Sequence, residues 1–349
     1  MKVLKKQFGI KDNQPVYIFT MKNNHGVEIT CLNYGCIITK ILAPDRNGDS
    51  ENIVLGFDNF TDYEVNSPYL GAIVGRFAGR ISEGTFQLNG KNYIVAQNEG
   101  SNHIHGGIKG FSHVLWDVKI IEKEHELSLD FFYHSPDGEE GYPGNVEMKV
   151  TYTLNNDNEF IISYYGVSDQ TTLLNVTNHT YFNLSGNLKR DILKHELTID
   201  SNAFLELQEN LLPTGNIINV ENTVFDFRNG REIGEGVKSN NIQNMIAHNG
   251  YDHPFLLNKN HQQEIILVEK ESGRKLIVET DEPCVVLYTG NNLGNELSFY
   301  GTPSRNYLGL CLETQHPPDS INHPQFQSSI LQEKQVYQTK TKYLFTTES

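Results

Sequence analysis

Apolar and polar positions alternate with a period of two in many parts of the chain, most clearly in its middle third. Apolar side chains occupy every second position of two successive stretches: Leu127, Leu129, Phe131 and Tyr133, then Val146, Met148, Val150, Tyr152 and Leu154. Because strand side chains point to opposite faces in turn, each stretch predicts a strand with one buried face. Turn sequences at 135–138, 142–144 and 155–158 separate and follow these stretches. This spacing is typical of an antiparallel meander.

Helical signals are weak by comparison. The segments 59–63 and 242–246 could form helices, but they are too short and too poorly periodic to cover a parallel sheet. No stretch is rich enough in Pro, Gly or Ser to be an interdomain linker, and no repeat of fixed period is visible. We therefore predict an all-β antiparallel sandwich in which residues 1–349 form one domain. Two large sheets would pack face to face, with the functional site on the concave side of one.

Composition and charge narrow the classes of partner. Hydrophobic residues make up 38% of the chain and charged residues 20%, which is enough apolar surface for a packed core. The net charge of -15 repels phosphate backbones and anionic lipid surfaces. We therefore expect no nucleic acid and no membrane among the partners. The net charge would neither attract nor repel a neutral small molecule.

Two further features suggest a cytoplasmic protein. The first residues become polar too early for a signal peptide, and no apolar run approaches the ~18 residues of a membrane span. The four cysteines, which are Cys31, Cys36, Cys284 and Cys311, are scattered among apolar neighbours. This pattern favours buried reduced thiols over a disulfide framework.

The first candidate for chemistry is the segment 102–107, which contains His103 and His105 followed by two glycines. On a strand, histidines two apart would point to the same side, as in some metal sites. Such sites usually have a carboxylate a few residues on, whereas Lys109 and Gly110 occupy those positions here. The alternative is a pair of loop histidines that bond to backbone groups.

Two strand-like segments place ionisable groups among apolar neighbours. His179 lies in the segment 177–186, which is dense in hydrogen-bonding side chains, and Glu313 lies in the apolar segment 310–315. A histidine titrates near neutral pH, and burial would raise the pKa of the glutamate toward that of a general base. The structural alternatives are a core histidine that caps a neighbouring strand and a strand-edge glutamate that faces solvent.

Further polar groups suit the binding of a sugar. Arg76 and Arg80 lie in a stretch of small residues, and Asp252 lies between aromatic residues. Vicinal hydroxyls need such donors and acceptors, and the C–H face of a sugar ring packs on aromatic side chains. Dinucleotide, phosphate-loop, serine-hydrolase and Cys-x-x-Cys motifs are missing. A glycosidase that uses Glu313 and Asp252 as its two carboxylates is a rival enzyme class.

At these residues the sequence resembles the aldose 1-epimerase family, also called the galactose mutarotase family. The matching segments follow one another through most of the chain: 33–35, 71–84, 101–110, 135–144, 177–186, 250–255, 288–291 and 312–324. The resemblance implies an all-β, galactose mutarotase-like single domain with an open sugar cleft, no cofactor and no metal. The implied substrate is a free monosaccharide such as galactose or glucose, whose α and β anomers are interconverted.

The resemblance also implies roles for individual residues. Glu313 matches the general base and His179 the general acid. His105 resembles the second histidine near the ring oxygen, while Arg80 and Asp252 match residues that hold sugar hydroxyls. Gly79 and Tyr181 are expected in the same substrate-binding site, and His103 has no assigned role.

Two positions depart from the family pattern. Gly79 replaces a usual asparagine, so one hydroxyl contact is missing or supplied by water, and Val286 stands where some relatives have a polar amide. Alternatives are therefore a non-catalytic carbohydrate-binding or sensing module, and an epimerase for a disaccharide or a hexose 6-phosphate. For the phosphate, the sequence offers no basic cluster beyond Arg76 and Arg80. The sequence is compatible with a monomer or a homodimer.

Overall fold

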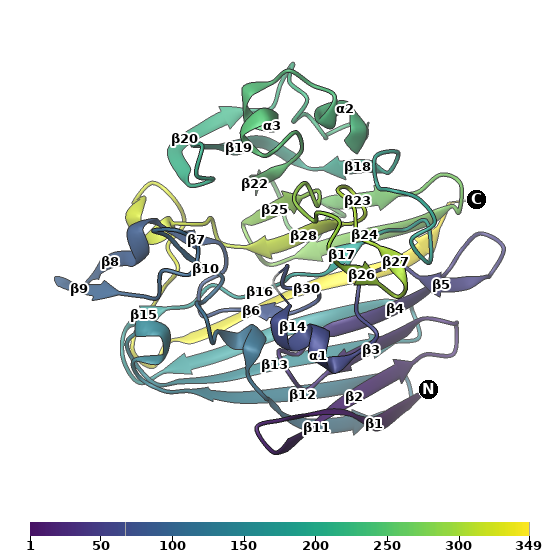
Figure 1. The fold of residues 1–349 in the computed structure, drawn as a ribbon, viewed down its shortest axis with the longest axis horizontal. Coiled ribbons are helices and arrows are strands. Elements are labelled where there is room, and N and C mark those ends of the chain that lie inside the picture. Colours follow the sequence, from purple (N-terminus) through teal and green to yellow (C-terminus); the bar gives the residue numbers. More distant parts are fainter. Residues whose placement is uncertain (67, 349) are drawn as a thin grey trace.

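The structure is a computed structural model that describes residues 1–66 and 68–348, and antiparallel sheets make up its framework (Figure 1). A nine-stranded sheet has the order β11 (Asp117–Glu122), β12 (Glu126–Ser135), β13 (Val146–Asn155), β14 (Glu159–Ser168), β30 (Val336–Thr347), β24 (Arg274–Thr280), β23 (Ile265–Val268), β18 (Glu196–Ile199) and β21 (Arg231–Glu232). A six-stranded sheet has the order β17 (Tyr181–Phe182), β28 (Leu310–Gln315), β25 (Cys284–Tyr288), β22 (Asp252–Leu257), β19 (Ser201–Leu207) and β20 (Pro213–Asn219). A five-stranded sheet follows chain order: β1 (Lys2–Lys11), β2 (Gln14–Lys22), β3 (Glu28–Leu32), β4 (Ile38–Pro44) and β5 (Ser50–Asn52).

The five- and six-stranded sheets together form the layer that faces the nine-stranded sheet. An isolated bridge between Val54 and Phe182 links them. Across the layers, the Tyr152 hydroxyl donates to the Cys36 carbonyl, and the hydroxyls of Thr314 and Thr341 lie 2.6 Å apart. The predicted all-β sandwich is thus confirmed, except that two sheets rather than one build its second layer. One hydrophobic cluster draws on all three sheets, which supports the proposal of a single domain.

The two strands predicted from alternation are β12 and β13, which pair with Leu129 opposite Tyr152. Along β13 every second side chain, from Val146 to Leu154, is buried. On β12 the side chains of Leu127, Leu129 and Phe131 are buried, whereas Tyr133 is half-buried. The apolar face of each strand packs into the hydrophobic cluster and the polar face points outward, which is the cause of the sequence alternation.

Helices are short in the part of the chain that the structure describes: α1 (Phe60–Val65), α2 (Ile233–Val237) and α3 (Ile242–Ile246). The first and third match the predicted helical segments, whereas α2 was not singled out. None of the described helices is long and apolar enough to cross a membrane. The four cysteines are free and buried, as predicted.

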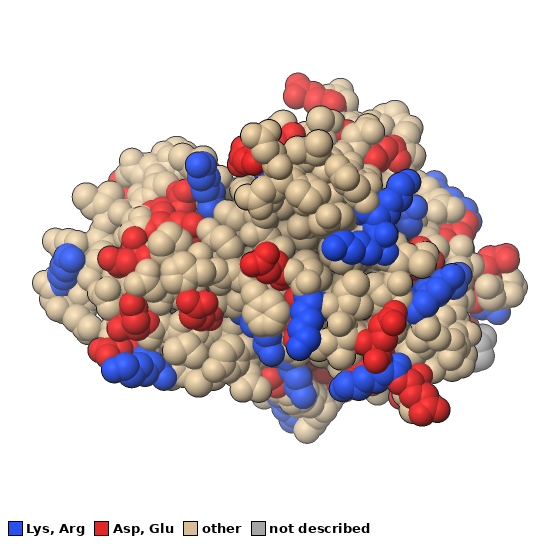
Figure 2. Space-filling model, turned by 90° about the horizontal axis from the view of Figure 1, so that it is seen from below, with Lys and Arg blue, Asp and Glu red and all other residues tan. Residues whose placement is uncertain are grey.

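Short strand pairs surround the large sheets: β6 (Ile73–Val74) with β16 (Thr177–Asn178), β7 (Arg80–Ile81) with β10 (His103–Ile104), β8 (Thr85–Leu88) with β9 (Lys91–Ile94), β15 (Thr172–Leu173) with β29 (Ile330–Leu331), and β26 (Ser298–Phe299) with β27 (Thr302–Pro303). Both chain termini lie on the side of the molecule opposite the β8–β9 hairpin (Figure 1). Seen from below, the surface carries acidic and basic side chains interspersed (Figure 2). The net negative charge therefore does not form a uniform acidic field on this face.

Candidate active site

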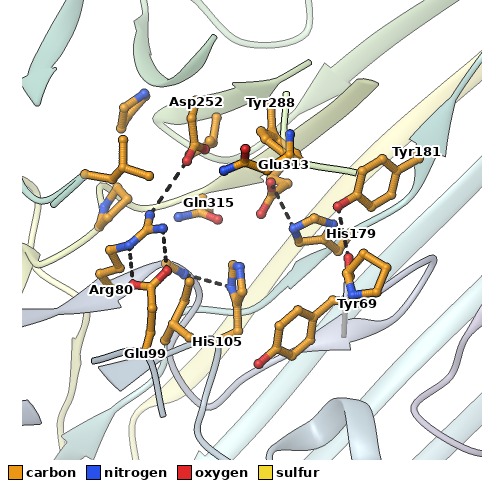
Figure 3. Close-up of a pocket in the computed structure, with 18 of the residues that line it drawn as sticks. Tyr69, Arg80, Glu99, His105, His179, Tyr181, Asp252, Tyr288, Glu313 and Gln315 are labelled. Carbon is orange, nitrogen blue, oxygen red and sulfur yellow. Dashed lines mark hydrogen bonds and ion pairs between the residues drawn. The ribbon is translucent and has the colours of Figure 1, made fainter. Parts of the chain in front are cut away.

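A cleft of about 650 Å³ opens over the six-stranded sheet (Figure 3). Strands β22, β25 and β28 supply its floor, and the short pair of β7 and β10 supplies one wall. The structure brings together in this cleft all seven residues that were expected at the site: Gly79, Arg80, His105, His179, Tyr181, Asp252 and Glu313. These residues are far apart in the sequence, so the antiparallel topology creates the site.

Glu313 lies on β28, whose alternate residues face opposite sides. Leu312 packs into the hydrophobic cluster, whereas Glu313 and Gln315 face the cleft. Glu313 is only 3% exposed, so the structure contradicts the alternative of a solvent-facing strand edge. Burial raises the pKa of Glu313 well above its ordinary value, the charge of Asp252 adds to this rise, and Arg80 opposes it.

His179 lies in the turn between β16 and β17 and points toward Glu313. Its Nε2 is 3.4 Å from Oε1 of Glu313, and its Nδ1 is 3.4 Å from Sγ of Cys311. Burial lowers the pKa of His179 to about 4, because a charged imidazole is poorly solvated there. The ring is therefore held at both nitrogens and stays uncharged at neutral pH.

The two histidines of the 102–107 segment point into different surroundings, so the expectation of a shared side was wrong. His103 is fully buried between the Ala96 carbonyl, 2.6 Å from its Nδ1, and the Tyr142 hydroxyl, 2.5 Å from its Nε2. Strand β10 ends at Ile104, and His105 has a φ of 52°. The alternation of a strand does not extend through that left-handed residue, so His105 turns into the cleft. His103 thus has the structural role of the alternative interpretation.

A hydrogen bond from the main chain determines the tautomer of His105. The Gly79 amide donates to Nδ1 of His105 over 3.2 Å, so Nδ1 is unprotonated. Burial lowers the pKa of His105 well below its ordinary value, and His179 and Arg80 add to this effect. The neutral ring must therefore carry its proton on Nε2. His105 is an uncharged hydrogen-bond donor.

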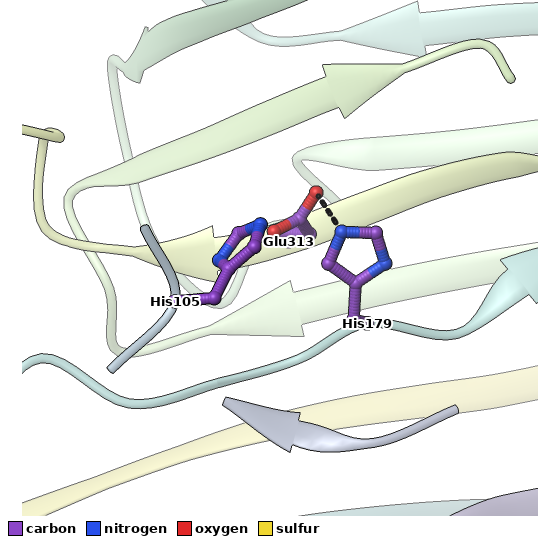
Figure 4. A group of neighbouring side chains, drawn as sticks. All are labelled: His105, His179 and Glu313. Atoms are coloured by element: carbon purple, nitrogen blue, oxygen red, sulfur yellow. Dashed lines mark ion pairs between the residues drawn. The ribbon is translucent and has the colours of Figure 1, made fainter. Parts of the chain in front are cut away.

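The same hydrogen bond bears on metal binding. His105, His179 and Glu313 offer ligand atoms that all lie within 4.8 Å of one another, an arrangement of two histidines and one carboxylate (Figure 4). A metal-bound histidine normally donates from its other ring nitrogen, whereas Nδ1 of His105 accepts. Coordination through Nε2 would break the bond with Gly79. The three side chains fit proton transfer better than metal coordination.

Arg80, Asp252 and Glu99 form the charged wall of the cleft (Figure 3). Arg80 donates from Nε and Nη2 to the two carboxylate oxygens of Glu99, over 2.6 and 2.7 Å. Its Nη1 is 3.8 Å from Oδ2 of Asp252. Burial raises the pKa of Asp252, although Arg80 opposes this shift. The wall offers carboxylate acceptors and guanidinium donors to the hydroxyls of a ligand.

The other arginine considered from the sequence is not in the cleft. Arg76 is 2% exposed and bonds to Ser135 and to the carbonyls of Pro136 and Pro143. It satisfies buried carbonyls and cannot serve as an anion-binding group for the cleft. Arg80 is then the one Arg or Lys among the described residues that line the cleft.

Sequence reasoning missed several lining residues, among them Tyr69, Glu99, Gln315 and Tyr288. Tyr69 lies with its ring centroid 4.8 Å from that of His105, and the Tyr181 hydroxyl donates to the Pro68 carbonyl over 3.0 Å. Glu99 could have been noticed, because it precedes His103 by only four positions. Tyr69 gave no signal, because no alternating or motif pattern surrounds it.

The structure gives a physical context for the two unusual positions. Gly79 has a φ of 76°, and a Cβ there would lie 2.8 Å from Cβ of Pro318. Any side chain would therefore displace Pro318 or the Gly79 main chain. Val286 lies directly opposite Glu313 on the neighbouring strand and lines the cleft. Neither residue brings a polar side chain to the cleft.

Comparisons with known proteins identify the family of this chain. The family model for aldose 1-epimerase matches residues 17–344. Galactose mutarotase of Sus scrofa is 39% identical over 323 residues, which cover 92% of this chain and 91% of that protein. Aldose 1-epimerase of Escherichia coli is 31% identical over 342 residues, or 97% of each chain. The crystal structure of galactose 1-epimerase from Lactobacillus acidophilus superposes with a TM-score of 0.89 at 30% identity, covering 100% of this chain and 99% of that one. The chain therefore belongs to the aldose 1-epimerase family.

Proposed function

We propose that this aldose 1-epimerase interconverts the α and β anomers of a free hexose, galactose or glucose, by acid–base chemistry that needs neither cofactor nor metal. The observation that carries the proposal is the contact of 3.4 Å between His179 and Glu313 in one buried cleft. Two proton-transferring groups so close together can act at the two ends of a hemiacetal. The anomeric hydroxyl and the ring oxygen are separated by a single carbon atom.

The reaction follows from the positions of the protons. Glu313 takes the proton of the anomeric hydroxyl while His179 protonates the ring oxygen, and the C1–O5 bond breaks to give the open-chain aldehyde. Rotation about C1–C2 presents the other face of the carbonyl. The bond then forms again as His179 takes the proton of the O5 hydroxyl and Glu313 gives its proton to the carbonyl oxygen, and the product is the other anomer. Atoms and electrons balance without an oxidant or a reductant.

Burial determines how many protons the pair holds. A low-dielectric environment disfavours both the carboxylate and the imidazolium, so the pKa of Glu313 rises and that of His179 falls to about 4. The pair therefore holds a single proton over the range between these two values. In the empty cleft this proton lies on Glu313. Its transfer to His179 creates the base and the acid that ring opening requires.

His105, Arg80 and Asp252 are proposed to hold the substrate. His105 offers a neutral Nε2–H toward the cleft because Gly79 occupies its other nitrogen. A neutral donor can bond to the ring oxygen without competing for the proton that His179 delivers. Arg80 and Asp252 offer donors and acceptors to ring hydroxyls. Positioned acid–base groups typically contribute ~10²–10⁴-fold to a rate, which is sufficient for a reaction that already proceeds slowly in water.

A panel of sugars tests the proposal. Polarimetry of freshly dissolved α-galactose, α-glucose, xylose, maltose and glucose 6-phosphate gives the rate of approach to anomeric equilibrium with and without protein. We expect the largest acceleration with galactose or glucose. Binding without acceleration would instead show a carbohydrate-binding module, and release of glucose from maltose would show a glycosidase. Either result would refute the proposal.

A further inference from the structure

The cleft carries an excess of negative charge. Among the described residues that line it, three carboxyl side chains, Glu99, Asp252 and Glu313, face one guanidinium, that of Arg80. Three histidines also line the cleft: His105 and His179, which are neutral at pH 7 because burial lowers both of their pKa values, and His248. Even with Glu313 protonated, the charges of Glu99 and Asp252 exceed that of Arg80.

Glu99 also occupies the part of Arg80 that could bind an anion. Nε and Nη2 of a guanidinium form the edge that matches the two oxygens of a carboxylate or a phosphate. In Arg80 both of these atoms already bond to Glu99, over 2.6 and 2.7 Å. Nη1 faces another carboxylate, that of Asp252, at 3.8 Å. The edge of Arg80 formed by Nε and Nη2 is therefore taken, and on the remaining side, formed by Nη1 and Nη2, an anionic substituent of a sugar would meet the carboxylate of Asp252 beside the donors.

We propose that Glu99 determines the charge specificity of this enzyme, so that the cleft accepts neutral and ammonium-bearing aldoses and excludes uronates and aldose phosphates. The inference rests on the proposed function, because it concerns the same cleft and the same reaction. Glu99 is a specificity-determining residue here, and no proton transfer is assigned to it. Its side chain is 38% exposed, in contrast to 14% for Arg80, which places it where it meets an incoming ligand.

The two effects of Glu99 act in the same direction. Its carboxylate repels an anionic ligand, and its bonds deny that ligand the Arg80 edge. The Glu99 carboxylate instead attracts the ammonium group of an amino sugar, because carboxylate oxygens accept hydrogen bonds from ammonium protons. The interaction free energy of two unit charges about 4 Å apart in a partly solvated site is large enough to change a rate constant roughly tenfold or more.

A series of sugars that differ only at C6 provides the test: galactose, galacturonate and 6-amino-6-deoxygalactose. Anomerisation of each sugar at pH 7 gives kcat/KM for the wild-type enzyme and for Glu99→Gln, which has similar size but no charge. We expect the wild type to use galacturonate at least about tenfold less efficiently than galactose. In Glu99→Gln, the ratio of galacturonate to galactose should rise about tenfold, and the ratio of the amino sugar to galactose should fall. Glu124→Gln is the matched control, because it removes the same charge at a side chain that is 88% exposed.

The outcomes separate this inference from the proposed function. A wild type that uses galacturonate as efficiently as galactose would overturn it, and this measurement needs no variant. An equal loss for all three sugars in Glu99→Gln would show that Glu99 only supports Arg80, and would overturn it as well. Glu99→Asn provides a second test if the glutamine variant folds poorly. If the wild-type enzyme did not anomerise galactose faster than the spontaneous reaction without protein, that result would instead refute the proposed function.

Discussion

At the scale of single residues, one physical cause shifts two pKa values in opposite directions. Burial disfavours charge, so it raises the pKa of the Glu313 carboxyl and lowers that of the His179 imidazole to about 4. An exposed pair of the same residues would hold its proton on the histidine. In the buried pair the shifts favour the glutamate, and the proposed mechanism transfers the proton to His179 across 3.4 Å.

This arrangement predicts the pH dependence of activity. The active pair holds one proton, so kcat/KM should fall on the acid side near pH 4, where His179 binds a second proton. On the alkaline side it should fall where the pair loses its proton. Asp252 raises the pKa of Glu313 by its negative charge. In Asp252→Asn the alkaline limb should therefore move to lower pH, which a pH–rate profile with galactose can show.

The position of the limb distinguishes this effect from a loss of binding. Asp252→Asn also removes a proposed ligand of the sugar, which would lower kcat/KM at every pH without moving the limb. The exposed variant Asp117→Asn serves as the control for a change in total charge. An alkaline limb that stays in place in Asp252→Asn would contradict the proposed electrostatic coupling.

Much of the candidate site could be predicted from single residues, but their orientations could not. Ionisable groups in apolar strands marked His179 and Glu313, and the resemblance to a family marked the others. The side chains of His103 and His105 diverge because His105 adopts a left-handed backbone, which sequence spacing does not encode. The contact between Glu99 and Arg80 depends on the fold, so the sequence could mark Glu99 only by its nearness to the two-histidine segment.

At the scale of elements, two short segments hold the cleft wall through reciprocal hydrogen bonds. The Gly79 amide donates to Nδ1 of His105, and the His105 amide donates to the Gly79 carbonyl over 3.1 Å. Gly79 precedes β7 and His105 follows β10, which pair with each other. The main-chain conformation of Gly79 thus sets both the place and the tautomer of His105.

Gly79→Ala should therefore lower both stability and activity. A Cβ at this position meets Cβ and Cγ of Pro318 at 2.8 and 2.9 Å, so either Pro318 or the main chain that bonds to His105 must shift. Gly90→Ala is a matched control, because Gly90 has a φ of 75° and nothing within 4 Å of its Cβ. The control should show only the left-handed strain of about 1–2 kcal/mol. Thermal unfolding and polarimetry of both variants provide the comparison.

The contrast between these glycine variants is informative. Equal unfolding temperatures and equal rates for Gly79→Ala and Gly90→Ala would contradict the proposed role of the main chain around His105. The mutarotation rate is the more direct of the two measurements, because it reports on the hydrogen bond between Gly79 and His105 rather than on strain alone.

Strands were easier to predict than their assembly into layers. The alternation of β12 and β13 reflects one buried face per strand, which is a local property. Strand β28 is buried along its whole length, so its sequence shows no alternation to read. The division of one layer into a five- and a six-stranded sheet depends on long-range pairing, such as that of Val54 with Phe182, and no local pattern predicts it.

At the scale of the whole molecule, buried neutral histidines link stability to pH. Burial lowers the pKa of His195 to about 4, as it does for His179, and that of His253 to about 3. In the unfolded chain these residues titrate near ~6.5. Between the two values the unfolded chain binds protons that the folded chain does not, so the free energy of unfolding must fall as the pH falls through this window.

His195→Gln tests this linkage away from the cleft. His195 is 1% exposed and accepts a hydrogen bond from the Leu184 amide, so the variant is expected to be less stable overall. The pH dependence is the decisive readout. Between pH 6 and pH 4.5 the slope of unfolding free energy against pH should decrease by up to about 1.4 kcal/mol per pH unit. Urea unfolding at several pH values measures it, and His125→Gln, at a side chain 80% exposed, is the control. An unchanged slope would mean that His195 titrates alike in both states.

The central claim is that Glu313 and His179 move protons on a sugar bound in one cleft, and Glu313→Gln tests it most directly. The amide keeps the size of the side chain but cannot accept the anomeric proton. Polarimetry of freshly dissolved α-galactose should show a rate at least about 10²-fold below that of the wild type, with an unchanged circular dichroism spectrum. A folded variant that reaches anomeric equilibrium as fast as the wild type would contradict the claim.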